Sequence, residues 1–192
     1  MVLEALAHPI VVIVASGTLV GVFLRGAAHK FLDFTWFAHT LAEYRILPVG
    51  LAVPAAGFLL AAEVAITLGL VLPETRFYAA AGAACLLVLY GAAIAVNLLR
   101  GRTRIDCGCG GAGQGLSWFL VGRNLALVGL ALIAGQQPGA GDIGAVGWFA
   151  TLATIASFWL LLAGAEKLAD NLSYLAAADD GAHRRDAGME TH

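Results

Sequence analysis

The sequence is poor in charged residues, and this shortage argues against a soluble fold. Only 12% of its 192 residues are Asp, Glu, Lys or Arg, whereas a soluble domain carries about a quarter. Hydrophobic residues make up 60% of the chain, and its mean hydropathy is +0.83. Because so few charges could not cover the surface of a soluble domain, we expect an integral membrane protein in contact with a lipid bilayer.

An excess of positive charge is also missing. Eleven Lys and Arg stand against thirteen Asp and Glu, so the formal net charge is −2. This balance excludes the basic surface with which proteins bind nucleic acid. The first residues lack the positive stretch that opens a cleaved signal peptide. We therefore expect the first apolar segment to be retained as a membrane span.

Cysteine is scarce as well. Three cysteines in a chain of this length cannot form a disulfide scaffold. Cys85 lies in an apolar run, where a buried cysteine behaves as a small hydrophobic residue. Cys107 and Cys109 are separated by Gly108 alone. This pair therefore requires a local explanation.

What the sequence does contain is a set of apolar segments of membrane-spanning length. A helix needs about 20 apolar residues to cross the hydrocarbon core. Five segments qualify, at about residues 9–31, 49–72, 77–99, 116–134 and 143–165. We expect an all-α integral membrane protein, a four-helix transmembrane bundle with a fifth span.

These segments suggest three parts. They are a four-helix membrane domain over 9–134, an additional transmembrane helix over 143–169, and a polar tail over 170–192 that we expect to be disordered.

Residues 31–44 mix aromatic with charged residues. They fit a helix lying in the membrane interface and an extension of the first span equally well.

Lys and Arg are distributed unevenly between the two sides of the expected spans. With five spans, the loop after span one, the cysteine loop and the C-terminal tail share a side. That side carries most of the basic residues, and the other side has only Arg76. The positive-inside bias places the cysteine loop in the cytoplasm of a multi-pass protein, which we expect in the bacterial cytoplasmic (inner) membrane.

The Cys107–Cys109 pair is a candidate for redox chemistry. A disulfide across one intervening residue departs from preferred geometry and is easier to reduce. Arg102 and Arg104 favour the reactive thiolate, and Asp106 could accept a proton. Two alternatives remain, inert thiols and half of a metal site. A zinc site needs about four ligands, and the only nearby additions are two histidines (His29 and His39), so we expect no metal.

Polar side chains at membrane depth form a second candidate group. Such residues are costly in hydrocarbon and usually mark a site or an internal pair. Glu63 lies roughly 20 Å into its helix and is a counter-charge for Arg123 or Lys30. The group is either an ion pair that fixes helix register or a pocket beneath the thiols for protons or a quinone headgroup. Its members are Arg25, His29, Lys30, Glu63, Asn97, Arg123 and Asn124.

Three stretches together resemble the methylamine utilisation protein MauE family, within the wider DoxX-like group of membrane proteins. They are residues 97–101 (Asn-Leu-Leu-Arg-Gly), 105–110 (Ile-Asp-Cys-Gly-Cys-Gly) and 120–124 (Leu-Val-Gly-Arg-Asn). Residues 29–31 and 54–63 also fit the family. The similarity covers roughly residues 10–135, and the Cys-Gly-Cys context with the downstream Arg-Asn is its most specific part.

The resemblance implies a bundle similar to vitamin K epoxide reductase, with Cys107 and Cys109 as the redox pair. Lys30, Glu63, Asn97 and Arg123 would form its polar interior. The family is associated with maturation of methylamine dehydrogenase, whose small subunit is rich in disulfides, together with a thioredoxin-like protein. No cofactor is evident, and a quinone stays open as a candidate. An exported substrate would require the two thiols on the outer side of the membrane, whereas the distribution of arginines places them on the cytoplasmic side.

The leading hypothesis is therefore a membrane thiol–disulfide oxidoreductase that exchanges with a thioredoxin-fold protein. The first alternative is a non-catalytic factor that docks a partner at the membrane. The second is a small transporter built around Glu63 and Arg123, although the sequence has no evident inverted repeat.

Overall fold

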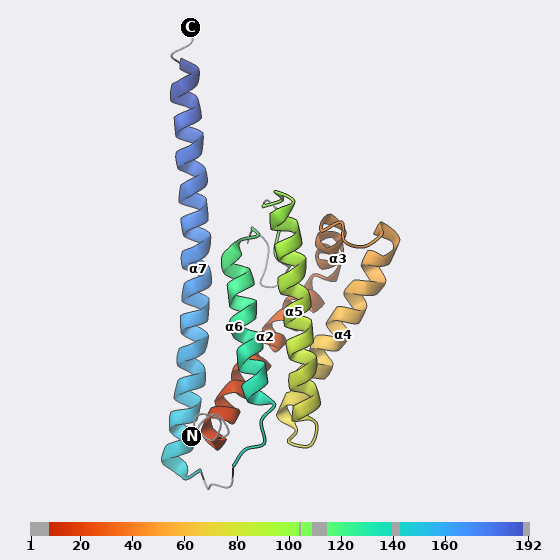
Figure 1. Ribbon diagram of the computed structural model, residues 1–192, viewed down its shortest axis with the longest axis vertical. Coiled ribbons are helices and arrows are strands. Elements are labelled where there is room, and N and C mark those ends of the chain that lie inside the picture. Colours follow the sequence, from red (N-terminus) through yellow and green to blue (C-terminus); the bar gives the residue numbers. More distant parts are fainter. Residues whose placement is uncertain (1–7, 104, 109–114, 140–142, 190–192) are drawn as a thin grey trace. The chain divides into compact units, whose positions relative to one another are not determined.

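The computed structural model describes residues 8–103, 105–108, 115–139 and 143–189, and every regular element in this part of the chain is a helix. The fold class predicted from the sequence is confirmed. The elements are α2 (Pro9–Leu32), α3 (Phe34–Glu43), the short 3₁₀ helix η1 (Val49–Leu51), α4 (Ala52–Val71), α5 (Arg76–Leu99), α6 (Trp118–Ala134) and α7 (Ala145–Met189), shown in Figure 1.

Four of these helical segments are long and apolar enough to cross a membrane. They are Pro9–Leu32, Val49–Val71, Arg76–Leu99 and Gly147–Ala165. The apolar helix α6 has 17 residues, so it is about 26 Å long and falls slightly short of a hydrocarbon core of about 30 Å. These lengths agree with a multi-pass membrane protein.

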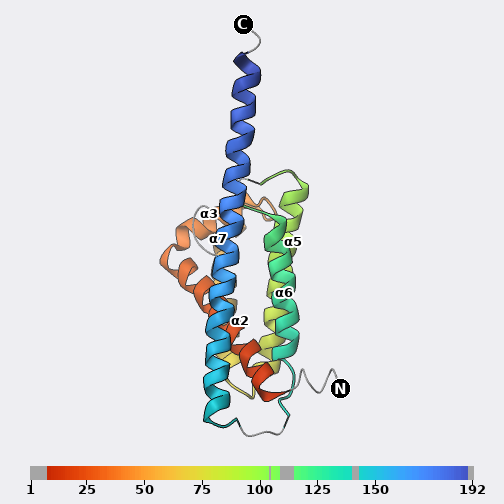
Figure 2. The same cartoon turned by 90° about the vertical axis from the view of Figure 1, so that its left-hand side faces the viewer.

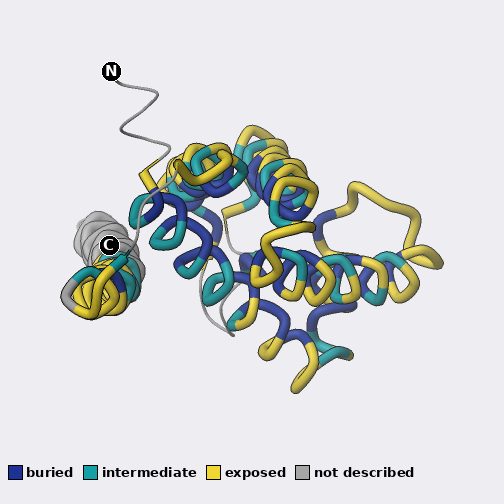
Figure 3. Tube along the Cα trace, turned by 90° about the horizontal axis from the view of Figure 1, so that it is seen from below, coloured by how far each residue is buried: buried dark blue, intermediate teal, exposed yellow. Residues whose placement is uncertain are grey.

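Helices α2, α4, α5 and α6 close into a four-helix bundle. Helix α2 packs against α4 and α6, and α5 packs against the same two helices (Figures 1 and 2). Buried positions face the inside of the bundle and exposed positions face outward (Figure 3). The exposed side chains include large apolar ones such as Phe58 and Leu68. An apolar outer surface of this extent is suited to lipid.

Residues 31–44 form a separate helix and do not extend the first span. The backbone N–H of Asp33 donates to the carbonyl of His29 and ends α2. The Asp33 carboxylate then accepts a hydrogen bond of 3.1 Å from the backbone N–H of Trp36, which caps the start of α3. Helix α3 packs on α2 and α4, at the end of the bundle where α5 finishes and α6 begins (Figure 1).

The chain divides into two compact units, residues 1–156 and 157–192. The second unit is the continuation of α7, which the structure extends to Met189. The sequence predicted a disordered tail over 170–192, and this stays a prediction; helix α7 includes the part of that segment up to Met189. The segment contains several alanines, the residue with the highest helix propensity, which favours helix despite the polar composition.

Helices α4 and α5 approach closely at Gly69. A Cβ atom added at Gly69 would lie 2.8 Å from the Cβ of Ala79. Ala79 has no flexible side chain that could move aside. The two backbones must therefore separate to admit any larger residue. Close packing through small residues is the usual way in which membrane helices associate.

We expect Gly69→Ala to destabilise the bundle by about 1–3 kcal/mol, because it overpacks this contact. Gly129→Ala in α6 is the matched control, since a Cβ there meets nothing within 4 Å. The measurement is the free energy of unfolding in detergent micelles titrated with SDS. Equal stability of the two variants would contradict the assigned α4–α5 contact.

Candidate functional site

A buried ion pair joins α2 to α4. The Lys30 ammonium lies 2.7 Å from Oε1 and 3.0 Å from Oε2 of Glu63. The two residues are only 3% and 2% exposed. Of the two counter-charges expected for Glu63, the structure pairs it with Lys30. Because each charge would be costly alone in the bundle, the pair must stay together.

Aromatic residues from two further helices complete the surroundings of this pair. The Tyr90 hydroxyl of α5 donates to Glu63 Oε1 at 2.8 Å. The Lys30 ammonium lies 5.0 Å from the ring centroid of Phe37 in α3 and 5.5 Å from that of Tyr90, within the range of cation–π attraction. The charges therefore tie α2, α3, α4 and α5 together.

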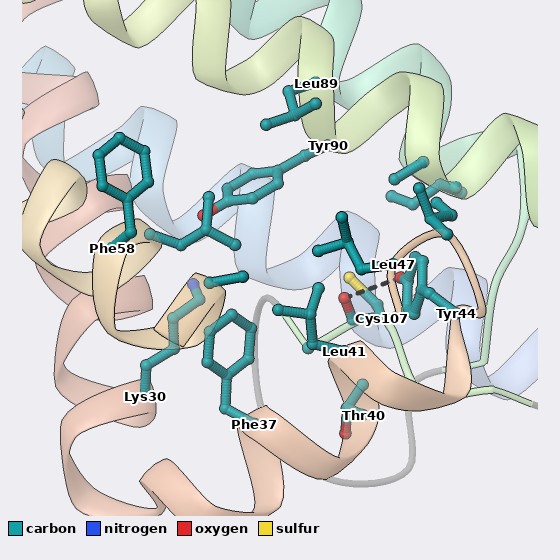
Figure 4. Close-up of a pocket in the computed structure, with 16 residues that line it drawn as sticks. Lys30, Phe37, Thr40, Leu41, Tyr44, Leu47, Phe58, Leu89, Tyr90 and Cys107 are labelled. Carbon is teal, nitrogen blue, oxygen red and sulfur yellow. Dashed lines mark hydrogen bonds between the residues drawn. The ribbon is translucent and has the colours of Figure 1, made fainter. Parts of the chain in front are cut away.

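Beside the ion pair lies an apolar cavity of about 280 Å³. It extends from Lys30 to the cysteine loop. Its lining includes Lys30, Phe37, Tyr44, Phe58, Tyr90 and Cys107, drawn in Figure 4. Cys107 is buried, with 6% of its surface exposed. The sequence left open an ion pair that fixes helix register or a polar pocket beneath the thiols. The cavity in the structure is mainly apolar, and Lys30 is the member of the buried ion pair that lines it.

The loop that carries Cys107 folds back on itself. Asp106 forms an isolated antiparallel bridge with Gly115, and the N–H of Leu116 donates to the carbonyl of Ile105 at 3.2 Å. These contacts join the two ends of the loop, which connects α5 to α6. Cys109, the second cysteine of the pair, lies outside the described residues, as does Arg104.

The other polar residues expected here are not all brought to the cavity. His29 is exposed, while Arg25 and Arg123 are partly exposed. Asn97 and Asn124 are buried, and each side-chain amide N–H donates to a carbonyl one turn earlier in its own helix. None of these five residues lines the cavity. Of the residues expected in the site, the structure brings three to the cavity or to the ion pair beside it: Lys30, Glu63 and Cys107.

Two other expectations about single residues have definite outcomes. Asp106 is partly buried and takes part in the backbone bridge of the loop. Cys85 is exposed on the outer surface of α5, whereas the sequence predicted a buried position. Its apolar neighbours in the sequence suggested burial, but a position on a membrane helix that faces lipid has the same apolar neighbours.

Sequence reasoning missed Phe37, Tyr44 and Tyr90. Tyr90 interrupts an apolar run, and a buried tyrosine hydroxyl usually finds a partner. This signal could have linked Tyr90 to Glu63. Tyr44 and Phe37 had no comparable signal, because their roles depend on where α3 folds.

Comparisons with known proteins agree on one family. The family model described as methylamine utilisation protein MauE matches residues 8–136. The methylamine utilization protein MauE of Methylorubrum extorquens is 40% identical over 175 residues, covering 88% of this chain and 92% of that protein. The protein of the same name from Paracoccus denitrificans is 42% identical over 121 residues, or 62% of this chain and 65% of its own. No solved structure matches.

Removing one partner of the buried ion pair should strongly destabilise the fold. We expect Glu63→Gln to cost about 3–5 kcal/mol, because it leaves the Lys30 ammonium buried without a counter-charge. The double variant Lys30→Met with Glu63→Leu should recover most of this loss. SDS titration in micelles measures both.

The exposed pair of His39 and Glu43 provides the matched control. These side chains are 75% and 49% exposed and 3.8 Å apart. Exposed pairs contribute little to stability, so Glu43→Gln should leave the unfolding curve almost unchanged. A similar loss in Glu43→Gln and Glu63→Gln would contradict the importance given to burial.

Proposed function

Because the chain belongs to the family of the methylamine utilisation protein MauE, we propose that it is a membrane thiol–disulfide redox protein whose reactive pair is Cys107 and Cys109. In this proposal it supports maturation of a partner such as methylamine dehydrogenase, and it works through a thioredoxin-like protein. Asp106, next to Cys107, is the proposed proton acceptor.

One observation carries the proposal: Cys107 lies in the wall of a cavity formed by membrane helices. A structural cysteine would need no cavity beside it. The second thiol of the pair is only two residues away in the chain. A reactive cysteine pair needs access to a reaction partner, and the cavity supplies space for a small lipid-soluble one.

The chemistry requires both cysteines. The thiolate of one attacks the disulfide of the thioredoxin-fold protein, which forms a mixed disulfide and releases one partner thiolate. The second cysteine then attacks its neighbour's sulfur, so the pair becomes oxidised and the partner reduced. The reverse sequence of the same two exchanges oxidises the partner.

A quinone is the membrane electron carrier that we assign to the cavity. Closing the Cys107–Cys109 disulfide from two thiols releases two electrons and two protons, which convert one quinone to a quinol. A cavity of roughly 150 Å³ holds a benzene ring, so about 280 Å³ is enough for one substituted ring. The aromatic lining of Phe37, Tyr44 and Tyr90 suits a planar ligand.

The exchange step predicts a trapped intermediate. We expect Cys109→Ser or Cys107→Ser to accumulate a mixed disulfide with a thioredoxin-fold protein, because the resolving thiol is gone. Non-reducing gel electrophoresis and mass spectrometry of membranes detect the adduct. Cys85→Ser, which removes the third cysteine, is the control and should trap nothing.

The alternative of a docking factor gains support from the burial of Cys107, which limits its contact with a protein partner. The double variant Cys107→Ser with Cys109→Ser separates the two functions. It should abolish methylamine-dependent growth if the pair is reactive. Full growth of this variant, with no adduct in either single variant, would leave docking as the function.

The quinone assignment predicts that the redox state of the pair depends on the quinone pool. In membranes depleted of quinone, the pair should accumulate as thiols, and added quinone should return it to the disulfide. Alkylation followed by mass spectrometry reports the fraction oxidised. A fraction that is the same with and without quinone would exclude quinone as the acceptor.

A further inference from the structure

The position of Cys107 depends on a residue 63 positions earlier in the chain. The Tyr44 hydroxyl donates a buried hydrogen bond of 3.1 Å to the backbone carbonyl of Cys107 (Figure 4). Tyr44 is 6% exposed, and its ring lines the same cavity as the Cys107 side chain. One side chain thus connects the end of α3 to the cysteine loop.

The chain turns sharply directly after Tyr44. The N–H of Tyr44 donates to the carbonyl of Thr40, and that of Arg45 to Ala42, which ends α3. Arg45 has φ of 48°, in the left-handed region that residues with a side chain rarely adopt. A left-handed residue at this position is a common way to end a helix. Tyr44 is thus the C-cap residue directly after α3, immediately before this turn.

The residue that follows Cys107 rests on the same helix. Gly108 has φ of 71°, which glycine adopts without strain. A Cβ atom at Gly108 would lie 3.5 Å from both Phe37 and Thr40 of α3. The loop therefore meets α3 at two successive residues, through the Cys107 carbonyl and through the backbone of Gly108.

These contacts give the Cys107 sulfur a definite environment. Leu41 and Leu47 line the same cavity as Cys107 (Figure 4). With 6% of Cys107 exposed, a water-borne protein has little access to this thiol while the loop rests on α3.

We infer that Tyr44 is a positioning residue, which holds Cys107 so that its thiol faces the membrane cavity and is shielded from water. Exchange between Cys107 and a protein partner then requires release of the Tyr44 hydrogen bond. This consequence rests on the proposed redox function. The shielding itself can be measured without any partner.

The test is the alkylation rate of Cys107 in the full chain, with Cys85→Ser and Cys109→Ser, in lipid nanodiscs whose two faces are both open to solvent. A charged maleimide that does not enter lipid reports access from water. N-ethylmaleimide, which enters lipid, reports access from the cavity. Tyr44→Phe keeps the ring and removes only the hydroxyl.

Loss of one hydrogen bond of ordinary strength should raise the rate with the charged maleimide about three- to tenfold. The rate with N-ethylmaleimide should change much less, so the ratio of the two rates rises. Tyr78→Phe is the matched control. Tyr78 is 75% exposed near the start of α5, outside the cavity lining, and its variant should leave the ratio unchanged.

Gly108→Ala tests the same contact without changing Tyr44. Alanine is strained at the left-handed φ of this position, so we expect the substitution to move the loop away from α3. This variant should also raise the ratio of the charged-maleimide rate to the N-ethylmaleimide rate. If Tyr44→Phe does not fold, Gly108→Ala alone tests whether the contact with α3 shields Cys107. An unchanged ratio in the variants that fold, or an equal rise with both reagents, would overturn the inference. If no mixed disulfide is trapped but the ratio changes as expected, the proposed redox function is refuted and the positioning role of Tyr44 stands.

Discussion

A buried ammonium–carboxylate pair fixes the arrangement of the helices. Lys30 in α2 and Glu63 in α4 are in direct contact, and Tyr90 in α5 donates to the same carboxylate. A charge separated from its partner inside the bundle would cost several kcal/mol. One helical turn is about 5.4 Å, so a slip of a single turn would break contacts of less than 3 Å. The pair therefore sets the relative register of three helices.

The cavity follows from this register. The ion pair stands at its edge, and its other walls are side chains that the register brings opposite one another, such as Phe58 of α4 and Leu89 of α5. The cavity thus lies between helices whose buried charges neutralise each other.

Helix α3 connects this interior to the cysteine loop. Its Phe37 ring faces the Lys30 ammonium and also supports Gly108, and Tyr44 at its end binds the carbonyl of Cys107. The ion pair and the thiol loop therefore rest on the same short helix. A movement of α3 would therefore alter the surroundings of the ion pair and of Cys107 together.

The sequence by itself determined the fold class, the approximate spans, the family and the Cys-Gly-Cys pair, because these depend on composition and on short local motifs. The family resemblance, drawn from residues 97–124 above all, is confirmed. The cost of charge in hydrocarbon also identified Glu63 as a residue in need of a partner. None of these inferences required knowledge of which helix faces meet.

Only the tertiary structure decided which partner Glu63 has, and that Tyr44 and Phe37 hold the cysteine loop. The tertiary structure also leaves Cys85 and His29 exposed, although their local sequence resembles that of buried positions. Apolar residues on a membrane helix face either lipid or protein, so hydrophobicity cannot tell the two sides apart. That distinction is made by the packing of helices distant in sequence, through close contacts at small residues and through one buried pair of charges.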